Sequence, residues 1–573
     1  MISATVGAAD DLPLTVPALL RRQAGERASH PLLLCDDETL TYAEADRRSA
    51  ALARGLLAVG AGKGTHVGIL HPNGAEFVVS WLAAARIGAV SFPLSTFSTD
   101  TELRSLLRGA DIEVLLSATS YRSRDFVAAL REAVPGLGLA EAPPLFDPAL
   151  PALRRVAFDV PGRADRGGTG PGSGVPGTVD PGVTDHVGAG PDGPMPTGWS
   201  RTALIEAGSR VAGEILAAAE EAVTPADRMV VIYTSGSSSE PKGVIHCHGP
   251  LIRHVANLNE IRRYASGEVL FAPSPFFWIG GFAFVLLATL VAGATAVCSN
   301  EREPARVLDL LERTRPTMTN GFAAAVAPLA KDPTFPGRDL SSMRRGNLYP
   351  IMPPDARPAD PELRHNMLGM TEAGSTVLLS DDESDQPESR RGSFGKPAPG
   401  FEARVVDPDT GKDCPPGELG ELWLRGPFLM EGYYGRERGE TFEPDGWYRT
   451  GDLFTTDEDG FHYFNGRRGE MIKTAGANVS PREVEAAVLE LTGLTAHVVG
   501  VDDEARGQVV AAMIRIPAGQ DGPDADELRE RLRTRLSAYK VPRRIVLAAD
   551  ADVPMTSSGK VDLRALKARL RDA

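Results

Sequence analysis

The chain has 573 residues, too many for one hydrophobic core, so two or more domains are expected. Its formal net charge of -15 argues against the broad basic surface that nucleic-acid binding needs, although a few local donors can still hold a phosphate. Four scattered cysteines without metal-ligand spacing, and an N-terminus without a signal-peptide pattern, predict free thiols in a reducing, cytoplasmic compartment; the cysteines are Cys35, Cys247, Cys298 and Cys414.

The first third of the chain alternates helical and strand patterns, which is typical of a mostly parallel sheet. Residues 40–60 carry apolar residues at helical spacing and end at a glycine, and residues 76–88 predict a second helix. Short apolar runs predict strands at 66–71, 88–95 and 112–118. We therefore expect a large α/β domain at the N-terminal end.

No charged residue falls between Glu268 and Glu301, and the run FAFVLLATLVAGATAV lies inside this stretch. A membrane span is one interpretation. Prolines and glycines interrupt the stretch, however, and the apolar remainder is shorter than the ~20 residues that a span needs. We expect a buried helix of the α/β core and no integral membrane segment.

Residues 161–198 are rich in glycine and proline. Such a composition forms a mobile loop or linker. A substrate lid is one hypothesis for this segment, and a disordered insertion is the interpretation that the composition favours.

From about residue 395 short strand patterns with turns predict a β-rich subdomain, and the last hundred residues resemble a small α+β unit. A helix is expected to begin after Ser480 as N-cap, with Pro481 in its first position and Glu483 three residues after the cap. We place the domain boundary between 466 and 467. Residues 1–466 then form the large domain and 467–573 a small mobile domain.

The segment YTSGSSSEPKGV, residues 233–244, follows a predicted buried strand. Backbone amides and hydroxyls can donate to phosphate oxygens, glycine lets the backbone come close, and Lys242 adds a positive charge. The segment is not a Walker loop, because the GK[ST] ending is missing. A triphosphate loop and a flexible surface turn are both consistent with this segment alone.

This loop resembles the signature loop of the adenylate-forming superfamily, which includes acyl-CoA synthetases, adenylation domains of peptide synthetases and beetle luciferases. NMLGMTEAG, GWYRTGDL, FNGRRGEMIKTAGANVSPREVE and PMTSSGKVDLRALK follow in the order of that family, so the resemblance covers nearly the whole chain. It implies an ATP-dependent acid–thiol ligase, which forms an acyl-AMP and passes the acyl group to coenzyme A.

The resemblance implies a role for each polar residue of these motifs. Glu372 helps to hold Mg²⁺, which suits a carboxylate beside a triphosphate, and Thr371 touches the α-phosphate. Asp452 can accept both hydrogen bonds of the ribose diol. A helix cap at Thr371 and a strand-end turn at Asp452 are the structural alternatives. The expected nucleotide-binding residues are Thr234, Ser235, Gly236, Ser237, Ser238, Lys242, Gly346, Asn347, Leu368, Gly369, Thr371, Asp452 and Arg467.

The C-terminal motifs imply the rest of the chemistry. By resemblance, Lys560 binds the acid's carboxylate and the α-phosphate during adenylate formation, and Lys473 acts in the second half-reaction of some members. Gly476 lies beside the pantetheine tunnel, and Gly469 stands at the hinge about which the small domain turns. An ordinary exposed lysine is the alternative for both Lys473 and Lys560.

The acyl pocket is expected at PFFWIGGF, residues 275–282, and NGFAAAVAP, residues 320–328, which are apolar and contain small residues. Members of the family that activate amino acids usually carry an aspartate in the first segment to pair with the α-amino group. None is present here, so the resemblance implies a hydrophobic acid, bulky or long, without that group. The expected substrate-binding residues are His248, Phe277, Trp278, Gly280, Gly281, Gly321 and Phe322. A structural histidine and a packed core tryptophan are the alternatives for His248 and Trp278.

Several residues depart from the family pattern on the ATP side. Ser239 replaces a loop glycine, Leu368 replaces an aromatic residue, and Gly346-Asn347-Leu348 replaces Gly-Gly-Ala. One hypothesis is therefore an enzyme with weak adenylation that mainly converts an acyl-adenylate supplied by an upstream adenylating enzyme. Loading of a free-standing carrier protein, a luciferase-like monooxygenase and a non-catalytic acyl-nucleotide binding protein are further alternatives.

Overall fold

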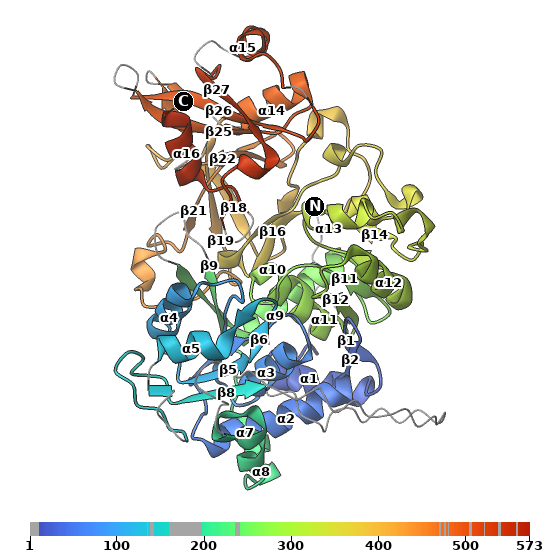
Figure 1. Cartoon of the computed structure of the whole chain (residues 1–573), viewed down its shortest axis with the longest axis vertical. Coiled ribbons are helices and arrows are strands. Elements are labelled where there is room, and N and C mark those ends of the chain that lie inside the picture. The colour runs from blue at the N-terminus through green and yellow to red at the C-terminus, as the bar shows by residue number, and fades with distance from the viewer. Residues whose placement is uncertain are drawn as a thin grey trace, which may run out of the picture.

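The computed structural model describes residues 11–134, 136–137, 142–159, 197–234, 241–468, 471–474, 477–479, 481–503, 507–520, 522–536, 540–556 and 560–572. Within these ranges the chain forms a large α/β part, a β-rich part and a small C-terminal part, which lies at the far end of the molecule in Figure 1. The fold expected from the sequence is confirmed in this architecture. The expectations for residues 161–196 and for the cap at Ser480 lie outside the described residues.

The first sheet of the large part contains the predicted parallel strands. Its order is β20-β10-β9-β4-β3-β5-β8, and the five strands from β9 to β8 run parallel. The strands are β3 (His66–Leu70), β4 (Val90–Pro93), β5 (Val114–Ala118), β8 (Arg155–Asp159), β9 (Arg228–Thr234), β10 (Lys242–Cys247) and β20 (Gly432–Tyr433). β10 runs antiparallel to both β9 and β20, so the two strands that flank the phosphate loop form a hairpin that is one strand in from the edge of the sheet.

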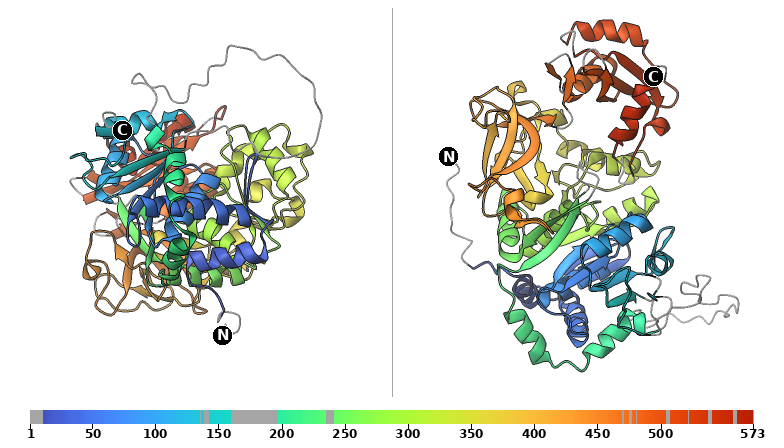
Figure 2. Two further views of the ribbon diagram at one scale, coloured as in Figure 1. Left: turned by 90° about the horizontal axis from the view of Figure 1, so that it is seen from below. Right: turned by 90° about the vertical axis from the view of Figure 1, so that its left-hand side faces the viewer.

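Several helices of this half connect consecutive strands of this sheet, and the others lead into or out of it. Thr41 and Glu44 form a capping box at the start of the predicted first helix, satisfying free backbone amides at that end. The helices are α1 (Val16–Glu26), α2 (Tyr42–Ala58), α3 (Ala75–Arg86), α4 (Asp100–Gly109), α5 (Phe126–Ala133), α7 (Arg201–Gly208), α8 (Gly213–Glu221) and α9 (His248–Ile261). Figure 2 shows them packed around the sheet.

The second sheet has the order β14-β13-β11-β12-β1-β2, and only β2 runs antiparallel to its neighbour. Its strands are β1 (Pro31–Cys35), β2 (Glu38–Thr41), β11 (Val269–Phe271), β12 (Thr295–Cys298), β13 (Met318–Thr319) and β14 (Arg345–Gly346). The helices packed with it are α10 (Ile279–Gly281), η2 (Phe282–Leu287), α11 (Ala288–Ala292), α12 (Pro304–Thr314) and α13 (Ala323–Ala330).

The apolar run is a buried helix only in its first part, which corrects the expectation of one helix. η2 and α11 are continuous and almost entirely buried. Gly293, at φ +66°, then ends the helix in a left-handed conformation that favours glycine, and the remaining residues form β12. Among the described residues no helix is long and apolar enough to cross a membrane.

The β-rich part contains the strands predicted from residue 395 onward and two earlier strands that were not predicted. A three-stranded sheet contains β15 (Leu368–Met370), β16 (Ser375–Leu379) and β17 (Lys396–Pro397), and a four-stranded sheet contains β18 (Glu402–Val406), β19 (Gly420–Arg425), β21 (Tyr448–Thr456) and β22 (His462–Arg467). One hydrophobic cluster joins both sheets to β10 and α9, so this part is anchored to the large domain.

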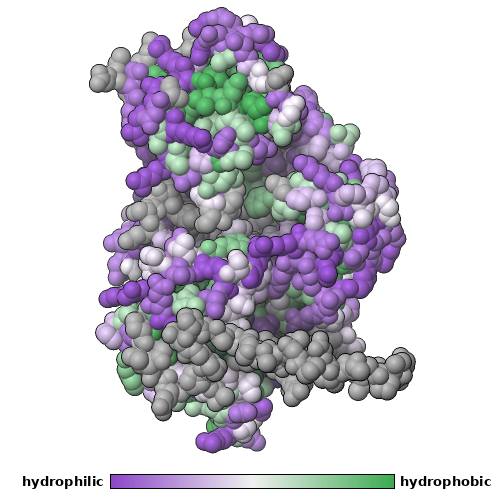
Figure 3. Space-filling model, viewed as in Figure 1, coloured by the Kyte–Doolittle hydropathy of each residue, from purple (hydrophilic) through white to green (hydrophobic). Residues whose placement is uncertain are grey.

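The C-terminal part has its own sheet and two cores. Its strands, in the order β24-β23-β26-β25 with β27 beside β26, are β23 (Ile472–Thr474), β24 (Ala477–Val479), β25 (Ala496–Asp503), β26 (Gly507–Ile516) and β27 (Arg544–Ala549). α14 (Pro481–Thr492) and α15 (Ala525–Arg533) cover one face and α16 (Leu563–Arg571) the other. In Figure 3 a group of hydrophobic residues lies on the surface of the C-terminal part, where Figure 1 labels β26 and β27. The boundary at 466/467 stays a prediction.

Candidate functional site

The two ends of the predicted phosphate loop lie side by side. Thr234 is the last residue of β9, Lys242 is the first of β10, and the two residues are direct partners in the antiparallel ladder. The loop between them, which carries Ser235, Gly236, Ser237, Ser238 and Ser239, lies outside the described residues. The Lys242 ammonium stands 5.1 Å from the centre of the Tyr433 ring, a cation–π distance.

Thr371 and Glu372 lie in a tight turn, η7 (Thr371–Ala373), which ends at Gly374 with φ +72°. The Tyr433 hydroxyl donates to Glu372 Oε1 at 2.8 Å, and the Tyr448 hydroxyl lies 3.0 Å from that of Tyr433. Burial and the neighbouring Glu372 raise the pKa of Tyr433 well above its usual value, so the hydroxyl stays a donor. Tyr433 therefore links the predicted phosphate lysine to the predicted magnesium ligand.

Asp452 and Arg467 are brought together by the pairing of β21 with β22. The Arg467 Nε donates to Asp452 Oδ1 at 2.8 Å, and the Asp452 side chain is 4% exposed while that of Arg467 is 50% exposed. The carboxylate is thus fixed in place, whereas the guanidinium can still turn toward a ligand.

The segment that was expected to line the nucleotide begins at Gly346 on β14. A Cβ at this glycine, which has φ +116°, would lie 2.0 Å from the Thr319 carbonyl oxygen, so the position admits only glycine. Asn347 Oδ1 accepts from the Gly321 amide at 3.1 Å. One side chain therefore joins the predicted nucleotide segment to the predicted acyl segment.

Leu368 and Gly369, also expected beside the nucleotide, lie on β15. Leu368 pairs with Leu378 across the sheet and packs against the hydrophobic cluster of the β-rich part. It is therefore oriented partly by the core.

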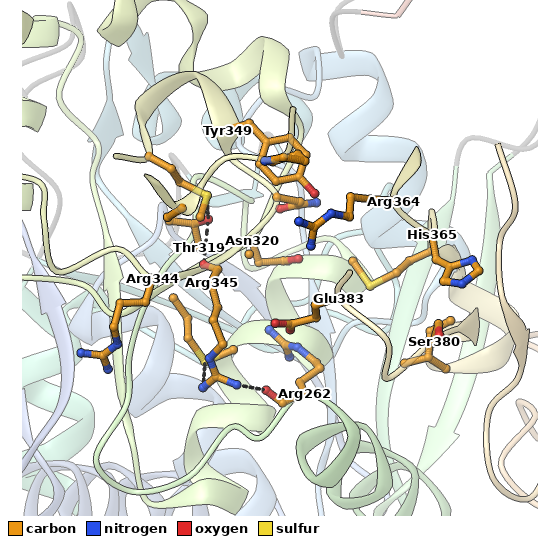
Figure 4. Close-up of a pocket in the computed structure, with 18 of the residues that line it drawn as sticks. Arg262, Thr319, Asn320, Arg344, Arg345, Tyr349, Arg364, His365, Ser380 and Glu383 are labelled. Atoms are coloured by element: carbon orange, nitrogen blue, oxygen red, sulfur yellow. Dashed lines mark hydrogen bonds between the residues drawn. The ribbon is translucent and has the colours of Figure 1, made fainter. Parts of the chain in front are cut away.

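A cavity of about 150 Å³ opens beside Gly346 and Asn347, and Figure 4 shows its walls. Ligand pockets commonly measure about 300–1,000 Å³, so this cavity suits part of a ligand rather than a whole acyl-nucleotide. Its walls mix polar and apolar side chains, whereas the sequence favoured an apolar acyl pocket. The lining includes Arg262, Asn320, Arg345, Tyr349, Arg364 and Glu383.

Arg262 is the least expected of these residues. Its guanidinium lies 3.7 Å from the centre of the Phe284 ring, and Nη1 donates to the Phe284 carbonyl at 3.2 Å. Burial lowers its pKa to about 10, which leaves it charged at neutral pH. Arg364 donates from Nε to Asp385 and directs its terminal nitrogens toward Asn320 in Figure 4. In the sequence Arg262 was indistinguishable from any arginine at a helix end.

The other expected acyl residues lie elsewhere. Phe277 and Trp278 form an aromatic group with Phe97 against the N-terminal core, and none of Phe277, Trp278, Gly280 and Gly281 lines the cavity. A Cβ at Gly281 would lie 2.0 Å from the Pro275 carbonyl oxygen, so this glycine serves close packing. Gly321 and Phe322 directly follow the lining residue Asn320, and Phe322 is 78% exposed.

His248 is buried in the N-terminal core. Its Nδ1 accepts from the Val16 amide at 3.2 Å, and burial lowers its pKa to about 4. These contacts favour a structural role for His248 over a role in binding the substrate.

The C-terminal residues are described only in part. Lys560 has an exposed side chain, and its backbone forms a turn with Thr556. Lys473 lies on β23 opposite Asn478, whereas Gly469 and Gly476 lie outside the described residues. In the described parts of the chain no group of three or more His, Cys, Asp and Glu could hold a metal ion by itself.

Comparison with known proteins supplies a family model and several relatives. The model for AMP-binding enzymes matches residues 20–434, and the model for the C-terminal domain of AMP-binding enzymes matches residues 483–560. A feruloyl-CoA synthase of Amycolatopsis sp is 31% identical over 529 residues, which cover 91% of this chain and 92% of that protein. The mitochondrial medium-chain acyl-CoA ligase ACSF2 of Mus musculus is 27% identical, over 92% of this chain and 83% of its own.

The fold also matches solved structures. The anthranilate CoA ligase AuaEII, in complex with anthranoyl-AMP, superposes with a TM-score of 0.75 over 98% of each chain at 23% identity. The two chains therefore share their architecture from end to end.

Proposed function

Because the chain belongs to the AMP-binding enzyme family of the adenylate-forming superfamily and is an acyl-CoA ligase, we propose that it joins a hydrophobic carboxylic acid to coenzyme A through an acyl-AMP formed from ATP. One observation carries the proposal. Thr234 and Lys242, the ends of the phosphate loop, lie side by side, and Tyr433 connects Lys242 to Glu372.

In the first step the acid's carboxylate oxygen attacks the α-phosphorus of ATP, the bond from that phosphorus to the β-phosphate oxygen breaks, and pyrophosphate leaves. Thr234 and Lys242 hold the outer phosphates, Thr371 the α-phosphate and Asp452 the ribose. Most of the catalysis is positioning and charge stabilisation. In the second step the thiol sulfur attacks the acyl carbon, its proton passes to solvent, and AMP leaves.

Magnesium fits this donor set. Mg²⁺ takes one or two carboxylates together with substrate phosphates and water, and Glu372 offers one carboxylate of which Tyr433 already orients one oxygen. Glu372 would hold the ion, which supplies neutralisation of the phosphate charge.

The same proposal gives the C-terminal domain its role. Residues 467–573 turn as a unit about Gly469, bringing Lys560 to the acid for adenylate formation and then Lys473 and Gly476 to coenzyme A. The exposed side chain of Lys560 and the separate cores of this domain support such a movement.

We further propose that the acid has an apolar body with an oxygen-bearing substituent. The feruloyl-CoA synthase, whose name specifies an oxygenated aryl acid, supports an aryl substrate. Arg262, Arg364 and Asn320 supply donors in the cavity beside the segment expected to bind the acyl group. The medium-chain ligase, by its name, points instead to an aliphatic chain, which the acid panel described below distinguishes.

Replacing Arg262 by methionine is expected to reduce the preference for hydroxylated or methoxylated aryl acids over unsubstituted ones by about tenfold, because a hydrogen bond to a charged donor contributes ~1.5–3 kcal/mol. The measurement is kcat/KM for matched acids. Arg263→Met is the control, since Arg263 is the exposed neighbour and does not line the cavity. An unchanged preference in Arg262→Met would show that the substituent lies elsewhere.

Impaired adenylation is the second candidate function, favoured by Ser239, by the replacements at residues 346–348 and by the leucine at 368. If the loop is the cause, Ser239→Gly is expected to increase ATP-dependent adenylate formation, because a side chain at that position restricts the backbone beside the phosphates. Pyrophosphate exchange measures this. Equal rates in wild type and variant would remove Ser239 as the cause.

The proposed function is tested by mass spectrometry with two parallel reactions. One contains a panel of aryl and medium-chain acids with MgATP and CoA, and the other contains the synthetic acyl-adenylates with CoA. Acyl-CoA in both supports the complete ligase, and acyl-CoA only from the adenylate supports impaired adenylation. Product on a phosphopantetheinylated carrier protein but not on CoA would contradict the proposed acceptor.

A further inference from the structure

The turn that carries Thr371 and Glu372 is held by a histidine that no motif singled out. His246 lies on β10, 125 residues before Thr371, and its Nε2 donates to the Thr371 carbonyl at 2.7 Å. The side chain is 2% exposed, and burial lowers its pKa to about 4, so the ring is neutral at pH 7. Since a carbonyl oxygen only accepts, the single ring proton lies on Nε2.

The same carbonyl accepts a second hydrogen bond, from the Gly374 amide at 2.9 Å. Gly374 closes the turn at φ +72°, and a Cβ there would lie 3.4 Å from His246 Cε1. The imidazole therefore packs closely against the face of this glycine. The Thr371 carbonyl oxygen and the His246 ring therefore hold both ends of the turn in place.

Glu372, the next residue, is held by two donors from β20 and the residues just before it. The Met430 amide donates to the Glu372 carbonyl at 2.8 Å, and the Tyr433 hydroxyl donates to its carboxylate. β20, which contains Tyr433, pairs with β10 through Val244 and Ile245, so these donors and His246 form one unit. We call His246, Met430 and Tyr433 the turn clamp.

β10 also carries the lysine of the phosphate loop. Lys242 and His246 are four residues apart on one strand, so their side chains lie on the same face of the sheet. A single short strand therefore sets the position of the phosphate lysine and of the Thr371–Glu372 turn.

We propose that His246 is a positioning residue for adenylate formation, which keeps Thr371 and Glu372 in register with Lys242. This inference rests on the proposed function, because it assigns the turn to the α-phosphate and to magnesium. His246 itself touches neither substrate nor metal. It acts by fixing the one carbonyl about which the turn is built.

The test compares three variants by pyrophosphate exchange at varied ATP and Mg²⁺. His246→Leu removes the donor, His246→Gln keeps a donor near the position of Nε2, and Tyr42→Phe is the control. Tyr42 is fully buried and donates to the Ala294 carbonyl at 2.9 Å, so its variant also loses a buried bond to a carbonyl, but far from the turn.

His246→Leu is expected to lower kcat roughly ten- to hundredfold and to increase the Mg²⁺ concentration for half-maximal rate, because the Thr371 carbonyl then keeps only the Gly374 amide as a donor and the turn relaxes. His246→Gln should restore most of the wild-type kcat and most of the wild-type Mg²⁺ dependence. Tyr42→Phe should lose thermal stability alone. A Mg²⁺ dependence in His246→Leu equal to that of Tyr42→Phe would overturn the inference, as would a glutamine variant no better than leucine.

Hydrogen exchange gives a result that needs no turnover. The Gly374 amide should exchange faster in His246→Leu than in wild type or Tyr42→Phe, because it shares the Thr371 carbonyl with the histidine. Unchanged Gly374 protection in His246→Leu overturns the inference even if the wild type activates none of the acids. Absence of turnover in the wild type counts against the proposed function instead.

Discussion

Replacing Lys560 by alanine should reduce acyl-adenylate formation by about 10²–10³-fold, because removing one donor to a developing oxyanion typically costs ~2.7–4 kcal/mol. Thioester formation from the synthetic acyl-adenylate should change far less, since that step needs no contact between this lysine and the acid's carboxylate. Single-turnover measurements give the rates of adenylate formation and of thioester formation separately.

The structure offers a clean control for this variant. The Lys560 side chain is exposed, and surface substitutions usually change stability by less than about 0.5 kcal/mol, so folding should be unaffected. Lys567→Ala on α16 removes a lysine from the same domain and should leave both half-reactions at wild-type rates. Equal losses in the two half-reactions of Lys560→Ala would contradict the assigned role.

Asp452→Ala is expected to increase KM for MgATP about 10- to 100-fold, because a hydrogen bond to a charged acceptor contributes ~1.5–3 kcal/mol. Asp452→Asn should lie between alanine and wild type. Initial rates at varied MgATP, with thermal unfolding in parallel, check the prediction.

Asp452→Ala should change the temperature of unfolding only slightly. Arg467, a partner of this carboxylate, is 50% exposed and can turn into water, so its charge is not left buried and unpaired. The control is Asp413→Ala, which removes a similar Nε–carboxylate pair with Arg404, 2.6 Å long, on the exterior of the β-rich part. A large loss of stability with an unchanged KM would make Asp452 a structural residue.

Local patterns predicted the elements of the fold well. The start of α2 follows from Thr41 and Glu44, whose side chains form a capping box with its first backbone amides. The apolar run was harder, because hydrophobicity alone does not separate helix from strand. Gly293 is the residue that divides it, and only its left-handed conformation shows where β12 must begin.

The sequence singled out motif residues as expectations for the site, but it did not point to the residues that contact them in the fold. Lys242 and Glu372 belong to patterns that suit a triphosphate. Tyr433 and His246 were missed because their partners lie 61 and 125 residues away, and nothing in the local sequence marks such contacts. Arg262 was missed because its burial depends on Phe284, which the sequence places only in an apolar run.

The hydrogen bond from the Gly321 amide to the Asn347 side chain has a practical consequence for protein engineering. A designer who changes residues 320–328, the expected acyl segment, also alters the anchor of the segment that we expect beside the nucleotide. Libraries at these positions should therefore be screened for ATP affinity as well as acid preference, and paired changes at Asn347 offer a way to separate the two traits.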